Sequence, residues 1–91
     1  MSKTMLTLKD GSCLTRDDLV QIISDAIFYT FGLKASKAAI KPKFCTISSR
    51  RCDDGHGFDF GYKCFFILKC SDGRSISYYY DDLTYSVYLA D

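Results

Sequence analysis

The sequence lacks a long hydrophobic run, an apolar leader and a strong net charge. No stretch approaches the roughly 18 apolar residues that a membrane helix requires, and the first five residues, Met-Ser-Lys-Thr-Met, do not resemble the apolar core of a signal peptide. The formal net charge of +1 provides no overall attraction to nucleic acid and no mimicry of it. We therefore expect a cytoplasmic protein that has no membrane partner.

Recognisable catalytic and metal-binding motifs are also lacking. The five cysteines include no C-x-x-C pair of the type that structural zinc sites use, and the glycines of residues 55–61 match neither a phosphate-binding loop nor a dinucleotide fingerprint. Cys52 and His56 are the one sequence-local pair of thiol and base, but no third group is available to orient them. Together with Asp53 and Asp59 they would meet around a metal only if their loop curled. We predict no catalytic residue, no metal and no cofactor.

Glutamate, asparagine and tryptophan are absent, whereas tyrosine and phenylalanine each occur seven times. A 91-residue chain with 47% apolar residues is typical of one packed domain and has room for only one core. The odd number of cysteines, in a chain that we expect to be cytoplasmic, predicts small reduced apolar side chains rather than a disulfide framework. The chain is therefore predicted to be a single domain, residues 1–91.

A helix is predicted over residues 16–31. Thr15 can cap its N-terminus, two aspartates in the first turn complement the helix dipole, and Gly32 is a natural residue to end it. A short strand over residues 4–8 precedes the helix and ends at an Asp-Gly turn.

The remainder of the chain alternates with the period of strands. We expect strands over residues 43–51, 62–70 and 76–80, with 85–89 as an optional last strand. Residues 62–70 are apolar on both faces, as in a central strand, and the following Cys-Ser-Asp-Gly-Arg-Ser stretch predicts a hairpin turn. The predicted fold class is α+β, with one main helix packed on an antiparallel sheet of three to five strands in the order β-α-β-β-β.

The predicted helix carries two apolar surfaces. At about 100° per residue, the residues that gather on the core-facing side are Leu19, Ile22, Ile23, Ala26, Ile27 and Thr30. Phe28 falls in the middle of the polar side, with Val20 and Phe31 flanking it. Two alternatives remain open for Phe28: residues 33–40 fold back over it, or it contacts a partner or a second copy of the chain.

The C-terminal strands are rich in tyrosine, serine and aspartate. Alternation places Ile76, Tyr78 and Tyr80 on one face, and Tyr79 with two serines on the other. Tyrosine and serine together are typical of adaptable protein-binding surfaces, although a sheet with half-buried tyrosines and solvated hydroxyls would show the same pattern. The predicted partner-binding residues, which include one helix and one loop phenylalanine, are Tyr79, Asp81, Asp82, Tyr85, Tyr88, Phe28 and Phe58.

Single-stranded nucleic acid is the alternative partner. Aromatic rings on a sheet can stack on bases, and a basic segment can contact phosphates. The basic residues, which lie in a stretch that contains no acid, are Lys34, Lys37, Lys41, Lys43, Arg50 and Arg51. Against this alternative, the chain contains no aromatic-glycine signature of an RNA-recognition motif, and two aspartates follow the tyrosine run directly.

We therefore expect a small non-catalytic protein that binds a protein partner and acts by steric occlusion, with self-association through Phe28 as a further option. Other small single-domain chains of this class include inhibitors encoded by mobile elements, such as anti-CRISPR proteins, and the immunity proteins of toxin pairs. The likeness is one of size and class, and no motif carries it.

Overall fold

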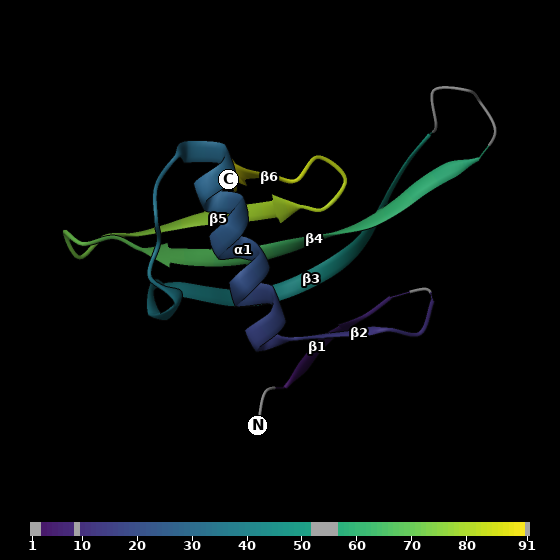
Figure 1. Cartoon of the computed structure of the whole chain (residues 1–91), viewed down its shortest axis with the longest axis horizontal. Helices are drawn as coiled ribbons and strands as arrows, with labels where there is room; N and C mark the ends of the chain where they lie inside the picture. The colour runs from purple at the N-terminus through teal and green to yellow at the C-terminus, as the bar shows by residue number, and fades with distance from the viewer. Residues whose placement is uncertain (1–2, 9, 52–56, 91) are drawn as a thin grey trace.

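Residues 3–8, 10–51 and 57–90 are described by the computed structural model shown in Figure 1. Along the chain, the elements are β1 (Thr4–Thr7), β2 (Cys13–Thr15), α1 (Arg16–Phe31), the 3₁₀ helix η1 (Lys37–Ala39), β3 (Ile40–Arg51), β4 (Phe58–Lys69), β5 (Ser75–Asp81) and β6 (Ser86–Leu89). One helix packs on an antiparallel sheet, which confirms the α+β class. The expected order omitted β2, a three-residue strand that pairs with β1 in a separate hairpin.

Helix α1 has the predicted bounds because its caps are strong. The backbone N–H of Asp18 donates to Thr15 Oγ1 at 3.2 Å, and the Thr15 N–H donates to Asp18 Oδ2 at 3.0 Å, which is a reciprocal capping box. At the other end Gly32 has φ 70°, in the left-handed region that glycine adopts without a Cβ penalty, and its N–H bonds Phe28 O at 2.8 Å.

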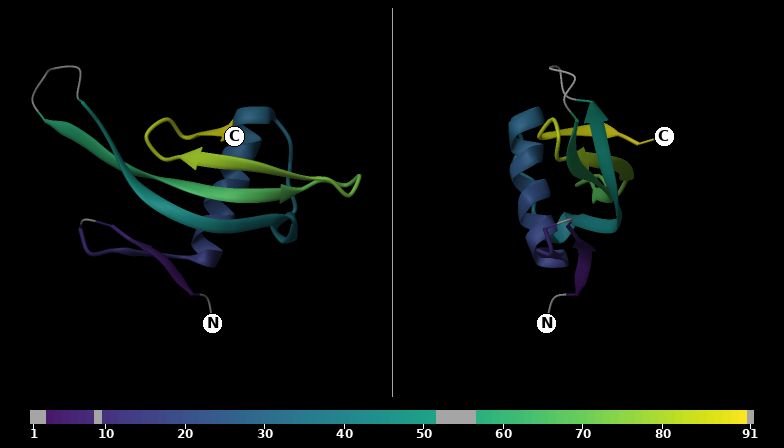
Figure 2. Two further views of the ribbon diagram at one scale, coloured as in Figure 1. Left: turned by 180° about the vertical axis from the view of Figure 1, so that it is seen from behind. Right: turned by 90° about the vertical axis from the view of Figure 1, so that its right-hand side faces the viewer.

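The main sheet has the strand order β3-β4-β5-β6, and all its neighbours are antiparallel. Strand β4 is interior, between β3 and β5, as its two apolar faces predicted. The helix lies against one face of this sheet, as the side view in Figure 2 shows. No second long helix is present among the described residues to cover the opposite face.

The core lies between α1 and the sheet. Its buried side chains are Leu19, Val20, Ile23, Ala26, Ile27, Ile40, Tyr62, Cys64, Phe66, Tyr80 and Val87. Val20 was expected in the outer apolar patch of the helix, and that assignment was wrong, because the residue is only 5% exposed. The β1–β2 hairpin contacts α1, and its leucines pack against the core.

The hairpin of β3 and β4 is longer than predicted. Strand β4 begins at Phe58 instead of residue 62, and Arg51 pairs with Phe58 at the last described position of the ladder. Aromatic residues at alternate positions favour a strand there despite the glycine between them. The expectation of Phe58 as a loop residue is corrected accordingly, whereas Cys52 and His56 lie outside the described residues. The far part of this hairpin projects beyond α1 (Figure 1).

Candidate partner-binding groove and aromatic sheet face

An open groove runs between α1 and the turn that joins β5 to β6. Its volume is about 930 Å³, and its lining residues are Ile22, Asp25, Ala26, Phe28, Tyr29, Tyr62, Tyr80, Asp82, Thr84 and Tyr85. The groove brings together the two surfaces that the sequence singled out separately, namely the outer part of the helix and the C-terminal tyrosine and aspartate residues. Half of its lining residues are aromatic, so its walls are large apolar surfaces with hydroxyl groups at their edges.

The β5–β6 turn forms one wall and is held closely against β4. The Asp82 N–H donates to Tyr62 O at 2.9 Å, and the Leu83 N–H donates to Asp81 Oδ1 at 3.0 Å. A Cβ atom added to Gly61 would lie 2.9 Å from Leu83 Cγ and 3.0 Å from an Asp82 carboxylate oxygen. Glycine at this position is therefore what allows the turn to approach β4 so closely.

The turn also contains a backbone conformation that is uncommon for a bulky residue. Tyr85 has φ 56°, and it is the only described residue other than glycine with a positive φ. The residue is 66% exposed. The conformation directs the chain from the turn into β6, and Tyr85 lines the groove instead of entering the core.

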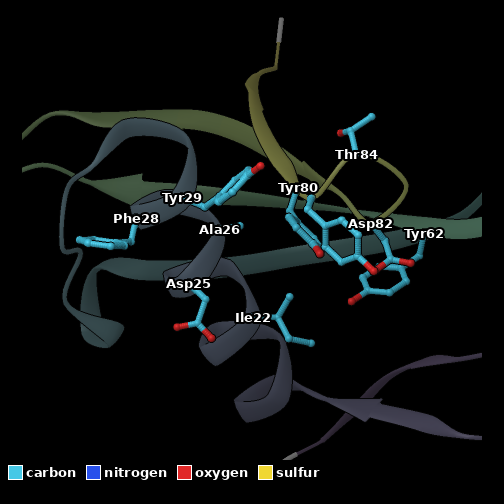
Figure 3. A pocket seen from close by; sticks show the side chains of 10 residues that line it. Ile22, Asp25, Ala26, Phe28, Tyr29, Tyr62, Tyr80, Asp82 and Thr84 are labelled. Atoms are coloured by element: carbon cyan, nitrogen blue, oxygen red, sulfur yellow. The ribbon is translucent and has the colours of Figure 1, made fainter.

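The helix forms the other wall. Figure 3 shows Ile22 and Tyr29 on the side of α1 that faces Tyr80, whereas Phe28 points away from Tyr80. Tyr29 is 75% exposed and Phe28 is 54% exposed. The alternative in which residues 33–40 cover Phe28 is therefore wrong. That segment passes beside Phe28 with Lys34 and Ala35, which line a hollow together with Phe28 and leave its ring exposed.

The charges of the groove are carboxylates. Asp82 is partly buried, and this burial raises the pKa of its carboxyl group, to which the neighbouring Asp81 also contributes, while a hydrogen bond from the Tyr80 hydroxyl acts in the opposite direction. Burial likewise raises the pKa of Tyr62 and of Tyr80, so both phenols stay neutral. Asp25 Oδ1 accepts a hydrogen bond from Gln21 Nε2 at 3.1 Å. Among the described residues that line the groove, none is basic.

A second surface lies on the face of the sheet away from α1. Phe44, Phe65, Tyr79 and Tyr88 are cross-strand neighbours on β3, β4, β5 and β6 in turn. Successive ring centroids are 4.7, 5.4 and 5.3 Å apart, with interplanar angles of 16, 37 and 28°. We call these four residues the aromatic row. The Lys63 ammonium lies 5.3 Å from the Tyr79 ring centroid.

The predicted basic residues do not form one surface. Lys34 and Lys37 lie between α1 and β3, whereas the other four lie along β3, which is an edge strand of the main sheet. Lys41 and Arg51 are separated by about 33 Å of extended strand, and Arg50 pairs with Asp59 at 3.8 Å. Lysine and proline on an edge strand discourage pairing with other chains. This protective role explains much of the composition of the segment, and it requires no ligand.

The seven predicted partner-binding residues separate into four places. Phe28, Asp82 and Tyr85 line the groove. Tyr79 and Tyr88 belong to the aromatic row, and Asp81 shapes the turn between the two surfaces through its bond to Leu83.

Phe58 lies apart from the other six, at the start of β4. Sequence reasoning missed Tyr29 and Tyr62 in the groove, and Phe44 and Phe65 in the row. Alternation places Phe65 and Tyr79 on defined faces of their strands, but only the register of the strands makes them neighbours.

The cysteines give one unexpected pair. Cys45 and Cys64 are directly opposite on β3 and β4. A hydrogen bond from the Cys64 thiol lowers the pKa of Cys45, and the same bond together with burial raises the pKa of Cys64. Within the described part of the chain, no three side chains of the metal-ligating types gather closely enough to hold an ion.

Comparison with known proteins finds no match, whether against protein-family models, curated proteins or solved structures. No helix in the described ranges has the length and apolar character needed to cross a membrane. The groove and the aromatic row are therefore the two surfaces that bear on function.

Proposed function

We propose that the protein is a binding module that holds a segment of a partner protein in the groove between α1 and the β5–β6 turn, and acts by steric occlusion of that segment. The observation that carries the proposal is the meeting of exposed aromatic rings from two distant parts of the chain, Tyr29 from the helix and Tyr85 from the turn, in one groove of about 930 Å³. Tyr29 lies within α1, and Tyr85 lies in the turn between two paired strands, so neither is on a free terminus. We propose that the protein acts in the cytoplasm, as an inhibitor or an immunity protein.

Tyrosine supports a protein partner for a physical reason. The phenol ring gives a large contact area, loses little conformational entropy when it is fixed, and keeps a hydroxyl group for hydrogen bonding. Exposed apolar surfaces that are concave and rimmed by polar groups are also typical of interaction sites. The groove shows this combination, because Thr84 and Asp25 accompany its aromatic residues.

The proposal is tested by affinity capture from native cells with three forms of the tagged protein. The groove variant carries Tyr29→Ser and Tyr85→Asn, since asparagine tolerates the positive φ of position 85. The matched control is Phe44→Ser, which removes an equally large ring from the opposite face, where Phe44 is 54% exposed. We expect one protein to be retained by the wild type and the control and lost by the groove variant.

Retention of that protein by the groove variant would contradict the proposal, as would its loss from the Phe44→Ser control. Circular dichroism spectra of the three forms should be the same, because all three substitutions remove exposed side chains. A difference in binding can then be assigned to the surface and not to unfolding.

Single-stranded nucleic acid on the aromatic row is the second candidate function. Its specific support is the row itself, which crosses all four strands of the main sheet and has the Lys63 ammonium over Tyr79. However, nearly parallel rings about 5 Å apart cover part of one another's faces, and a base needs an open face to stack on. Fluorescence anisotropy with a labelled single-stranded oligonucleotide at low salt tests this candidate, which requires binding that weakens steeply as salt is added.

A further inference from the structure

The groove contains an acidic group that is incompletely paired. The Asp82 carboxylate is partly buried beside aromatic rings, and the Tyr80 hydroxyl, a neutral donor, is a hydrogen-bond partner. The nearest charge along the chain is Asp81, which repels it. A carboxylate removed from water is stabilised by a cation far more than by a neutral donor.

The chain supplies no cation to this position from its described residues. No described lysine or arginine lines the groove, and the salt bridges of the described residues involve other aspartates, Asp59 and Asp72. Lys34 lines a separate hollow that shares Asp25 and Phe28 with the groove but does not include Asp82. The charges on the described lining of the groove are therefore negative, and they stand beside aromatic rings.

We infer that the partner segment that enters the groove carries a basic side chain, whose cation pairs with Asp82 while its stem packs against the tyrosine rings. This inference rests on the proposed function and names the chemistry of its partner. Aromatic faces attract cations through the ring quadrupole, and a guanidinium group can bond a carboxylate with two donors while stacking on a ring. Arginine is accordingly the side chain that fits this set of groups best.

The test uses the full chain and a small probe, N-acetyl-arginine methylamide, followed by ¹H–¹⁵N NMR. The matched neutral probe is N-acetyl-citrulline methylamide, which has nearly the same shape without the charge. We expect the arginine probe to cause saturable shifts of the amide signals of Asp82, Leu83 and Tyr85. The citrulline probe should leave these signals in place.

Two variants assign the response to a carboxylate. Asp82→Asn keeps the size of the side chain and should weaken arginine binding by about tenfold or more. Asp72→Asn, in the β4–β5 turn away from the groove, should leave binding unchanged. The spectrum of each variant also shows directly whether it is folded.

Equal shifts with both probes, full binding by Asp82→Asn, or no shifts with arginine would each overturn the inference. None of these outcomes touches the capture experiment, which depends on Tyr29 and Tyr85. A partner that is lost by the groove variant but retained by Asp82→Asn would support the proposed function. It would contradict only the inference that the partner carries a basic side chain.

Discussion

The backbone N–H of Val87 donates a hydrogen bond to Thr30 Oγ1 at 3.1 Å, across 57 positions in the chain. The bond joins the last turn of α1 to β6, which is an edge strand of the main sheet. It occupies an N–H group that would otherwise be unpaired at a sheet edge, and it ties α1 to the strand that follows the β5–β6 turn.

Replacement of this hydroxyl should destabilise the fold. We expect Thr30→Val, which keeps the shape of the side chain, to lower the free energy of unfolding by about 1 kcal/mol, because the N–H of the buried Val87 loses its acceptor. Urea denaturation followed by circular dichroism measures the change. Thr30→Ser retains the hydroxyl and is the control; equal losses in the two variants would show that the methyl group matters and not the bond.

A second expected outcome concerns the close approach of the β5–β6 turn to β4. Gly61→Ala places a methyl group 2.9 Å from Leu83 Cγ, so we expect a loss of about 1 to 3 kcal/mol of stability through overpacking. The double variant Gly61→Ala with Leu83→Ala relieves the clash and should lose less than the sum of the two single variants. Additive losses in denaturation experiments would contradict the contact.

Much of the fold is predictable from the sequence where local chemistry decides it. The bounds of α1 follow from Thr15 and Gly32, whose capping roles need no distant contact, and the interior place of β4 follows from its apolar residues on both faces. The burial of Val20 is different, because it depends on tertiary packing that the helical period alone does not define. The three residues of β2 likewise show no period that would reveal a strand.

The groove was only partly predictable for a similar reason. The sequence indicated Phe28, Asp82 and Tyr85 as surface residues of two separate elements, but their meeting depends on how α1 lies across the sheet. The part played by Gly61 depends on a contact with Leu83, 22 positions later in the chain. Such a contact follows from strand register, which alternation alone does not define.

The raised pKa of Asp82 gives a pH dependence with a defined sign. The folded state binds the carboxyl proton more tightly than the unfolded state, whose ordinary pKa is 3.8. The stability contributed by this group therefore increases as pH falls through the folded pKa, is complete below 3.8, and is lost as pH rises toward neutrality. At neutral pH the Asp82 carboxylate is ionised, and its contribution to the stability of the wild type is then least favourable.

The substitution Asp82→Asn removes this titration while Tyr80 and Asp81 remain. The free energy of unfolding of the wild type minus that of the variant should rise as pH is lowered from 7 to below 3.8. Denaturation curves at a series of pH values give this difference. A difference that stays flat, or falls on acidification, would show that Asp82 is not perturbed in the predicted direction.

The exposed Phe28 allows a second copy of the chain to bind at the helix side of the groove. If two copies meet there, Phe28→Asp should leave the circular dichroism spectrum unchanged and lower the mass measured by light scattering at high concentration, since a charge would be buried between them. Leu89→Asp, at an exposed position on β6, is the control and should retain the wild-type mass. Monomeric masses for the wild type and both variants would remove self-association from the functions of this surface.

A double-mutant cycle in the aromatic row distinguishes packing of its rings within the protein from stacking of the rings on bases. The rings of Tyr79 and Tyr88 are 5.3 Å apart at 28°, so we expect a double-mutant cycle with Tyr79→Ser and Tyr88→Ser to give a coupling energy of about 0.5 to 1.5 kcal/mol. Because the Tyr88 hydroxyl also bonds Thr84 Oγ1 at 2.9 Å, Tyr88→Phe is measured separately to subtract that bond. A coupling near zero, accompanied by oligonucleotide binding that Tyr79→Ser abolishes, would mean that the ring faces are available to bases. Strong coupling without oligonucleotide binding would instead mean that the row stabilises the sheet, which leaves the groove as the binding surface.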